Sequence, residues 1–492
     1  MKNKLKIVSV ALTIVLMLSA FLVSMAPATQ PPTRALFTLP YEEYYPDELT
    51  GRAGHWPAAS GLLGQEGFAG YPADFSDGTV AWDLDLIDAE PGKLSYDGDG
   101  IYIAVLDTGL VPNWRDYFPE ERIAAEYGIG FYESVLYKNG EYIYGGEVHQ
   151  GSFLGKLAHG THVTSTIIGY SYYGQYIRGV APKAKIIPVK VLDCYENLGG
   201  DTFGTDLMVA AGINYIADLA ESEEIEIVIS MSIGGPEPGD VIEEAIDYAI
   251  SKGVIVVAAA GNRGRPMGWP ASPTGAPTWD WIMDWPGAYP QVISVGSCGW
   301  GMGTTITPGM GEWEPYPQPR PRTWWYKDVP EDMEHYLTYI SYFSSRECVN
   351  PDFPTYTVEL DVVAPGSWVL GPYPGDTFGY QHIPWWAQGS PWNPNTPPPN
   401  YWYVGGTSMA TPHVSGVAAL MLEKDPTLTQ AQVEAKLKAT ATPLPTIIPP
   451  NPFAYGYVRW AGEPAPIYAF LWAADATGAG IIQADAAIAA IP

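Results

Sequence analysis

The sequence predicts an α/β protein with a doubly wound, mostly parallel sheet flanked by helices. The first observation is a series of short apolar runs rich in Val and Ile, which is typical of strands buried on both faces. The second is that stretches with helical periodicity lie between several of these runs. Strands that alternate with helices form parallel sheets with right-handed crossovers. The 492 residues are 47% hydrophobic, which is enough for a full core.

The predicted strands are the apolar runs at residues 101–106, 186–192, 225–233, 254–260, 292–295 and 360–363. A helix is predicted over residues 205–220, because Val209, Ile213, Ile216 and Ala220 share one face at helical spacing. Further helices are predicted at 83–87, 240–251, 417–422 and 429–440, where Asp240 and Thr429 are residue types suited to N-caps.

The N-terminus has the pattern of an export signal. Residues 1–6 are cationic, residues 7–25 carry no charge, and residues 26–28 have the small-x-small form of a cleavage site. The uncharged run is also just long enough to span a bilayer, so residues 1–28 are either a signal peptide or a retained anchor. Residues 29–80 form an N-terminal segment that is a possible pro-segment, and residues 81–492 form the main domain. Both alternatives predict a protein that acts outside the cytoplasm.

Charge and insertions restrict the function classes further. The formal net charge of −29 argues against a nucleic-acid partner, whose phosphates such a surface would repel, and favours a monomer. Segments rich in Pro, Trp and Tyr at 299–338, 371–400 and 443–468 are interpreted as long surface insertions. The three cysteines form no CxxC or Cys/His cluster, so no structural zinc site is expected.

Three segments carry residues suited to nucleophilic catalysis. Asp107 ends an apolar strand, His159 precedes an apolar helical stretch, and Ser408 lies in a glycine-flanked segment before another such stretch. In parallel α/β sheets, ligands bind beyond the carboxyl ends of the strands, which is where such residues would meet. Taken singly, such residues more often have structural than catalytic roles: an aspartate after a strand forms a turn, a histidine is part of the core, and a serine before a helix is its cap.

Together these residue types match one chemistry. A serine hydroxyl becomes a strong nucleophile when an imidazole takes its proton, and a buried carboxylate holds the imidazole in the required tautomer. A position at the start of a helix would place Ser408 near the positive end of the helix dipole, which stabilises the negative charge that develops on the substrate oxygen. Pro412 is expected in the first turn of that helix, where its missing N–H has no intrahelical partner.

The chain resembles the subtilisin-like serine proteases in five segments: AVLDTG (104–109), HGTHV (159–163), MSIGG (231–235), AAAGN (258–262) and GGTSMATPHVSG (405–416). The order Asp, His, Ser is also that of the family. The resemblance covers residues 80–492 with insertions. It implies a secreted serine endopeptidase of broad specificity that forms an acyl-enzyme on Ser408, with His159 as general base and acid. Asp107 would orient His159, and Asn262 would donate to the oxyanion.

The resemblance also implies a substrate-binding region. A substrate strand would pair with Ser232, Ile233 and Gly234, and the side chain before the scissile bond would be bounded by Ala259, Ala260, Gly261 and, as floor, Gly268. Arg263 would lie near the mouth of this site. There it would either favour acidic side chains over Lys or be a solvated surface residue.

Other features depart from the family or leave alternatives open. No cofactor is required for the chemistry and no metal site is predicted. Many relatives bind calcium in the loop that corresponds to residues 170–178, but tyrosines replace the usual asparagines there, and phenols are poor ligands for Ca²⁺. Structural calcium elsewhere stays possible.

By the same resemblance Cys298 and Cys348 would flank the 299–338 insertion, which predicts a disulfide between them and leaves Cys194 unpaired. A catalytically silent scaffold and an exopeptidase are the alternative functions. Protein or peptide substrates are the expected partners in either peptidase case, and a membrane is expected only if residues 1–28 are retained.

Overall fold

A computed structural model describes the parts of the chain that form the sheets, the helices and the candidate site. The described residues are 72–138, 141–195, 201–264, 282–300, 338–341, 343–348, 352–374, 387–389, 400–444, 456–458, 468–470, 472 and 474–492. The predicted signal peptide or anchor, most of the N-terminal segment and Gly268 lie outside these residues. In the described part of the chain, no helix is both long and apolar enough to cross a bilayer.

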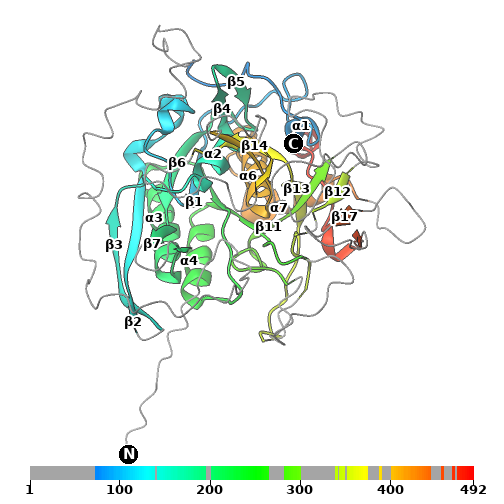
Figure 1. Ribbon diagram of the computed structural model, residues 1–492. Helices are drawn as coiled ribbons and strands as arrows, with labels where there is room; N and C mark the ends of the chain where they lie inside the picture. The colour runs from blue at the N-terminus through cyan, green and yellow to red at the C-terminus, as the bar shows by residue number, and fades with distance from the viewer. Residues whose placement is uncertain are drawn as a thin grey trace, which may run out of the picture.

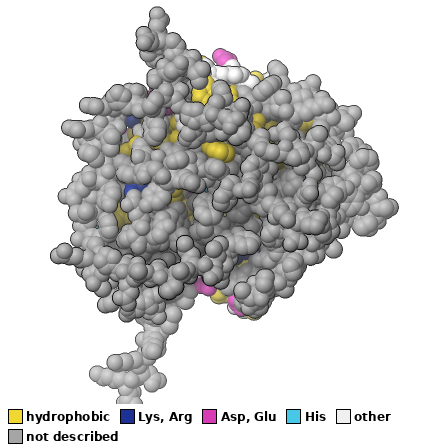
Figure 2. All heavy atoms as spheres, in the orientation of Figure 1, with side chains coloured by type: hydrophobic (Ala, Val, Ile, Leu, Met, Phe, Trp, Pro, Cys, Tyr) yellow, Lys and Arg dark blue, Asp and Glu magenta, His cyan; other side chains and the backbone are white. Residues whose placement is uncertain are grey.

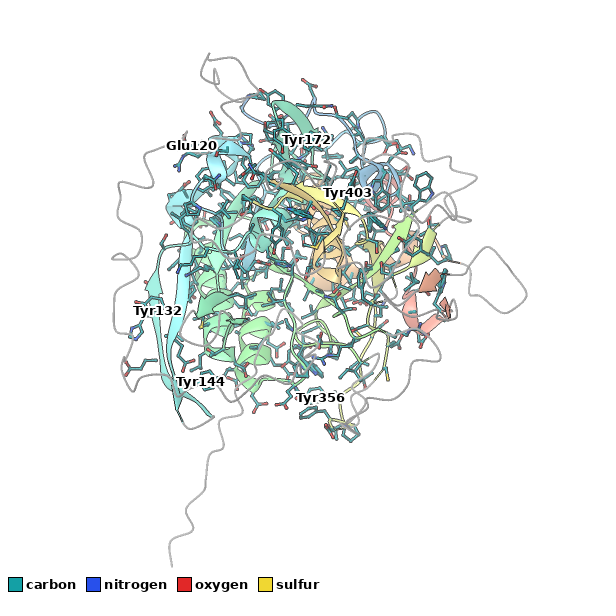
Figure 3. The ribbon with its side chains drawn as sticks, viewed as in Figure 1. Glu120, Tyr132, Tyr144, Tyr172, Tyr356 and Tyr403 are labelled. Atoms are coloured by element: carbon teal, nitrogen blue, oxygen red, sulfur yellow. The ribbon has the colours of Figure 1, made fainter. Side chains whose placement is uncertain are left out.

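The protein is built on a mixed sheet with a parallel centre. Its order is β12-β11-β10-β9-β1-β6-β2-β3, and β13 also pairs with β11. All the central pairs are parallel, whereas β11–β12 and β2–β3 are antiparallel. The β2–β3 hairpin extends along one side of the molecule and carries Tyr132 and Tyr144 (Figure 3). The strands are β1 (Tyr102–Asp107), β2 (Ile129–Lys138), β3 (Glu141–Gly151), β6 (Lys185–Lys190), β9 (Ile227–Met231), β10 (Ile255–Ala259), β11 (Ile293–Trp300), β12 (Thr338–Ile340) and β13 (Val362–Pro365).

The helices cover both faces of this sheet (Figure 1). Along β1, Ile103 and Val105 belong to the hydrophobic cluster that includes α2, α6 and α7, whereas Ala104 and Leu106 belong to the cluster that includes α3 and α4. Successive side chains of a strand point to opposite faces, so a strand buried on both sides has to be apolar throughout. The predicted doubly wound α/β class is therefore confirmed, and each of the six predicted strands is present.

The helices are α1 (Trp82–Asp85), α2 (His159–Ile168), α3 (Asp206–Glu223), α4 (Asp240–Ser251), α6 (Thr407–Lys424), α7 (Gln430–Thr440) and α8 (Ala484–Ala489), with short 3₁₀ turns at Trp114–Asp116, Glu120–Arg122, Ala125–Tyr127 and Ala474–Ala476. Thr429 caps α7 through a capping box with Gln432, as predicted. The prediction that Asp240 caps α4 was wrong. Gly239 is the N-cap, and Asp240 is the first helical residue, where its charge still faces the positive end of the helix.

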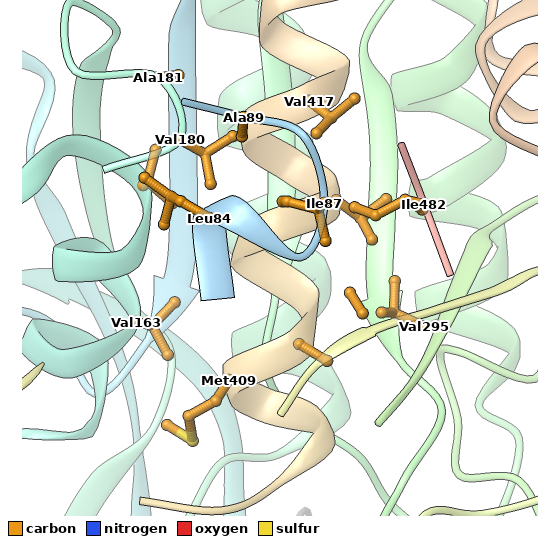
Figure 4. Packing of buried hydrophobic residues seen from close by; sticks show 14 of the residues in the cluster. Leu84, Ile87, Ala89, Val163, Val180, Ala181, Val295, Met409, Val417 and Ile482 are labelled. Carbon is orange, nitrogen blue, oxygen red and sulfur yellow. The ribbon is translucent and has the colours of Figure 1, made fainter. Parts of the chain in front are cut away.

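The short helix α1 packs against the long helix α6. Figure 4 shows α1 and the following residue Ile87 against α6, and the side chains of Leu84, Ile87 and the α6 residue Val417 are at most 2% exposed. On the polar side of this contact, His413 Nε2 of α6 lies 3.3 Å from Asp83 Oδ2. The predicted helix at 83–87 is therefore present with slightly shifted bounds, and it is anchored on the helix that carries Ser408.

Smaller sheets lie around the central one. They pair β4 (Gly169–Tyr172) with β5 (Gln175–Arg178), β7 (Asp193–Tyr195) with β8 (Asp201–Phe203), β14 (Val369–Pro372) and β15 (Ala387–Gly389) with β16 (Tyr401–Val404), and β17 (Gly456–Val458) with β18 (Tyr468–Phe470). The described residues of the predicted surface insertions at 371–400 and 443–468 therefore include short strands, which their loop-like composition did not predict. The insertion at 299–338 begins inside β11.

The predicted disulfide between Cys298 and Cys348 was wrong, since both residues are thiols in the structure. Cys298 lies inside β11 and is fully buried, and its antiparallel neighbour on β12 is Ile340. Cys348 is partly exposed and follows Glu347, whose N–H donates to Asp475 O at 2.7 Å. Burial raises the pKa of the Cys298 thiol well above its usual range. Cys194 lies in β7, and its side chain is outside the described part of the chain.

Acidic side chains reach the surface at opposite edges of the face drawn in Figure 2.

One cluster of acidic side chains among the described residues is compact enough to consider for a metal ion: ligand atoms of Glu359, Asp361 and Glu434 lie within 4.8 Å of one another. The ammonium group of Lys438 sits among them, 2.9 Å from Asp361 Oδ1 and 3.4 Å from Glu434 Oε1, and it also pairs with Glu359. A side chain of this protein therefore supplies the cation for this cluster.

Replacing Lys438 by methionine is expected to lower the free energy of unfolding by about 1–3 kcal/mol at pH 7, because it leaves three neighbouring carboxylates without their cation. Burial already raises the pKa of Asp361 and of Glu434 in the folded protein. Loss of Lys438 raises both pKa values further, so the penalty grows as pH rises through them and disappears at acidic pH, where the groups are protonated. Urea unfolding at pH 7 and pH 4.5 measures this. A loss of equal size at both values would contradict it.

Candidate active site

The candidate catalytic residues lie at the ends of central strands or at the starts of α2 and α6, two helices that contact each other. Asp107 is the last residue of β1, Asn262 follows β10, and β9 lies between these two strands. His159 is the first residue of α2, and Ser408 is the second residue of α6. Because strand order reverses around β1, this edge of the sheet is where the topology predicts a ligand site.

Asp107 and His159 form a buried pair. His159 Nδ1 lies 2.8 Å from Asp107 Oδ1 and 2.9 Å from Oδ2, and the two side chains are 5% and 0% exposed. The Thr108 N–H donates to Asp107 Oδ1 at 2.6 Å, which holds the carboxylate in place. Gly160 has no side chain here because a Cβ would meet Asp107 Oδ1 at 3.1 Å and would collide with Gly109 O. The pair leaves Nε2 of His159 as the ring nitrogen available for proton transfer.

The second histidine of the HGTHV segment is not a candidate base. His162 is completely buried in α2, and burial, together with the nearby His159, lowers its pKa to about 3. Its imidazole is therefore neutral near pH 7.

Ser408 and Ser232 hold each other by reciprocal hydrogen bonds. Ser408 Oγ donates to Ser232 O at 3.1 Å, and Ser232 Oγ donates to Ser408 O at 2.7 Å. The second bond follows from the sequence of α6. Pro412 lies four residues after Ser408, in the second turn of the helix, and lacks the N–H that would bond Ser408 O. The prediction that Pro412 lies in the first turn was wrong, and the carbonyl that it leaves open is satisfied by Ser232.

Two hydrogen-bond donors converge beside Ser408. Asn262 Oδ1 accepts from Thr407 N at 2.8 Å and from Thr407 Oγ1 at 3.0 Å, which orients the amide. A Cβ added to Gly406 would lie 3.6 Å from Ser408 N and 3.7 Å from Asn262 Nδ2, so one point in space is close to both nitrogens. Ser408 N belongs to the first turn of α6, whose N–H groups have no intrahelical acceptor. An anionic oxygen placed there would meet two donors and the positive end of an 18-residue helix.

The predicted substrate-binding residues form two neighbouring segments. Residues 232–234 follow β9, and residues 259–261 end and follow β10, so parallel pairing of β9 with β10 brings the segments together. Ser232, Ile233, Ala259 and Ala260 are all at most 4% exposed.

Sequence reasoning missed Asp284 and Thr407. Asp284 lies between the two segments and Thr407 orients Asn262. Thr407 stood within a recognised motif, whereas Asp284 had only its position after a Trp- and Pro-rich stretch to mark it.

The loop that corresponds to a calcium site in many relatives is a tight hairpin. Strands β4 and β5 are joined at Tyr173 and Gly174, which both have positive φ angles. The Tyr172 and Tyr173 rings each lie 4.8 Å from the Tyr401 ring, and Tyr170 Oη donates to Leu370 O at 2.9 Å. The tyrosines of this loop therefore serve aromatic packing and a structural hydrogen bond.

Comparisons with known proteins agree on one family. The model of the subtilase family matches residues 98–457. Fervidolysin from Fervidobacterium pennivorans is 31% identical over 70% of this chain and 38% of its own length. Subtilisin NAT from Bacillus subtilis subsp. natto is 28% identical over 73% of this chain and 64% of its own length. The alignments therefore span less than two thirds of either relative. The crystal structure of fervidolysin, described as a keratinolytic enzyme related to subtilisin, matches with a TM-score of 0.51 and 26% identity, covering 83% of this chain and 45% of that one.

Proposed function

Because the chain belongs to the subtilase family, we propose that it is a secreted serine endopeptidase that hydrolyses peptide bonds through an acyl-enzyme on Ser408. Two observations support the proposal: Asp107 and His159 form a buried pair, and the Ser408 N–H and the Asn262 side-chain amide are both close to one point at the start of α6. A binding scaffold would have no need of this combination.

In the proposed first step Ser408 Oγ turns from Ser232 O toward His159 Nε2, gives up its proton to that nitrogen and attacks the carbonyl carbon of the substrate. The imidazolium that forms is stabilised by Asp107, which faces Nδ1 with both carboxylate oxygens. His159 then gives the proton to the leaving amine as the C–N bond breaks. Water, activated by the same imidazole, hydrolyses the ester and restores Ser408.

The negative oxygen of each tetrahedral intermediate would be bound by Ser408 N and Asn262 Nδ2. Thr407 supports this role, because its two hydrogen bonds to Asn262 Oδ1 fix the amide and leave its NH₂ group for the substrate. Donors that are oriented before the reaction stabilise the charge without rearranging during it.

Substrate binding would use main-chain hydrogen bonds along residues 232–234, which favours broad specificity for extended protein or peptide segments. No metal or cofactor takes part in the proposed chemistry. Residues 1–28 are proposed to direct export, as a cleaved signal peptide or as an anchor at the outer face of the membrane, and a monomer is proposed.

The test is covalent labelling of the purified protein with a fluorophosphonate. The wild-type chain is expected to take up one equivalent, Ser408→Ala none, and Ser415→Ala, which changes another buried serine of α6, one equivalent again. Digestion of denatured casein then defines the activity: internal fragments support an endopeptidase, and released tripeptides indicate an exopeptidase. Absence of labelling in a folded wild-type protein would indicate the silent scaffold.

A further inference from the structure

The two N–H donors that converge beside Ser408 come from different parts of the chain. Asn262 follows β10, whereas the Ser408 N–H belongs to the first turn of α6. Their separation decides whether one anionic oxygen can meet both, because an N–H···O hydrogen bond is strong only at about 2.7–3.2 Å. A short stretch of chain after β12 contacts the surroundings of both donors. It contains three fully buried serines, Ser341, Ser344 and Ser345, and we call these residues the brace.

At one end the brace holds the backbone around Asn262. Ser345 N donates to Gly261 O at 2.9 Å, and Arg263 N donates to Ser345 Oγ at 3.1 Å. One serine is therefore bonded to the residues immediately before and after Asn262. Because Ser345 is 0% exposed, water cannot take the place of its hydroxyl unless the chain moves.

Asp284 holds the same segment by separate contacts. Its carboxylate accepts from the backbone N–H of Asn262, and its own N–H donates to Ala260 O at 2.8 Å. Arg263 Nε also lies 2.5 Å from Asp284 Oδ1. These contacts attach the segment to the residues after β10 and around Trp285, whereas Ser345 connects it to the brace.

At its other end the brace contacts the turn that supports the start of α6. Ser341 Oγ and Ser367 Oγ share a hydrogen bond of 2.8 Å. Gly366 O, next to Ser367, accepts from Gly406 N at 2.7 Å, and Gly406 O accepts from Met409 N at 2.9 Å. All five residues are buried. A short series of hydrogen bonds therefore connects the brace with the helix end that presents the Ser408 N–H.

Strand β11, which pairs with both β12 and β13, keeps the brace in place (Figure 1). Ser341 N donates to Ser297 O and Ser297 N donates to Ser344 Oγ, both at 2.9 Å, and the hydroxyls of Ser297 and Ser341 lie 2.7 Å apart. A Cβ added to Gly366 would collide with Ser297 Oγ, so this hydroxyl packs directly against the turn before α6. A satisfied buried network of this kind makes its surroundings rigid.

We propose that Ser345 is a positioning residue for Asn262, and that through the brace it fixes the separation of Asn262 Nδ2 from Ser408 N. This inference rests on the proposed peptidase function. Ser345 acts through Asn262 and not on the substrate. Thr407 orients the amide of Asn262, whereas Ser345 fixes the backbone from which that amide extends. Donors placed before the reaction stabilise the negative oxygen without moving during it.

Replacing Ser345 by alanine tests the proposal. The variant keeps the backbone bond to Gly261 but removes the oxygen that accepts the Arg263 N–H, so this peptide group should turn toward another acceptor and move Asn262 with it. A misplacement of about 1 Å can cost about 10²-fold in rate, and we expect kcat to fall about tenfold. KM should stay within about twofold, because the substrate is proposed to pair with residues 232–234. Steady-state kinetics on a chromogenic peptide measures both.

The same exchange in an Asn262→Ala protein separates positioning from a general structural role. Once the amide is gone, Ser345 has nothing left to position, so Ser345→Ala should change kcat by less than about twofold there. A general structural loss would lower kcat by the same factor in both backgrounds. Ser294→Ala is the matched control. Ser294 is also a fully buried serine, near the start of β11, and its Oγ accepts from Asp361 N at 2.8 Å, so this variant should lower the melting temperature and leave kcat unchanged.

Fluorophosphonate labelling separates this inference from the proposed function. If the wild-type protein neither labels nor cleaves the peptide, the proposed function fails. If it does both, the inference is overturned by a folded Ser345→Ala protein with a kcat within twofold of the wild-type value, or by an equal loss in the Asn262→Ala background. If Ser345→Ala does not fold, Ser341→Ala decides, since it breaks the link to Ser367. It must then lower kcat about threefold in the wild-type background and have no effect in Asn262→Ala, where only one donor remains.

Discussion

Replacing Asp107 by asparagine is expected to lower kcat by about 10⁴-fold with little change in KM, which is the loss that the same exchange causes in a chymotrypsin-type triad. The structure provides the reason. The Thr108 N–H holds Oδ1 as an acceptor, so the amide NH₂ of an asparagine would lie at the Oδ2 position, 2.9 Å from His159 Nδ1. The imidazole would then lose the partner that stabilises its protonated form. Steady-state kinetics on a chromogenic peptide measures the effect.

Asp218→Asn is the matched control for this exchange. Asp218 lies on α3 and accepts from Tyr248 Oη at 2.8 Å at the surface, so kcat should stay within twofold of the wild-type value. Thermal unfolding of both variants shows whether the fold is kept. A folded Asp107→Asn protein with more than a tenth of the wild-type kcat would contradict the orienting role of Asp107.

Replacing Asn262 by aspartate is expected to lower kcat by about 10²–10³-fold, a range known for loss of the corresponding donor in subtilisin rather than one calculated from this structure. Aspartate keeps the oxygen that accepts from Thr407 N and Oγ1, so the orientation of the side chain is preserved. It replaces the NH₂ donor by a second acceptor, which repels a negative oxygen. The loss should therefore appear in kcat and not in KM.

Asn262→Ala distinguishes the two roles of this residue. It removes the donor and also the acceptor of the Thr407 N–H, so it should lower the melting temperature as well as kcat, whereas Asn262→Asp should lower kcat alone. Calorimetry together with kinetics measures both quantities. If Asn262→Asp retained a kcat within tenfold of the wild-type value, Asn262 would have no part in binding the oxyanion.

Local patterns in the chain predicted most of the fold. Strands buried on both faces are apolar at most positions, as β10 is throughout and β9 is except at Ser230, and this pattern is visible in the sequence without knowledge of the partner strands. The helix face of Val209, Ile213 and Ile216 and the cap at Thr429 are similarly local. Two wrong predictions, the cap at Asp240 and the turn of Pro412, were errors of one turn or less in where a helix begins, whereas the third involved partners distant in the chain. The Cys298–Cys348 disulfide failed because Cys298 faces Ile340 across the sheet.

The sequence by itself determined the residue types of the candidate site and their places at strand ends and helix starts, because short segments such as those around Asp107, His159 and Ser408 carry both the chemistry and the local conformation. Only the tertiary structure decided the contacts between segments. Examples are the Asp107–His159 hydrogen bonds, the reciprocal bonds of Ser232 with Ser408, and the ion pair of Asp284 with Arg263. Hydrogen bonds and ion pairs of this kind depend on distances of a few ångströms between residues that are far apart in the chain. Such distances are established only when the sheet and both layers of helices have packed.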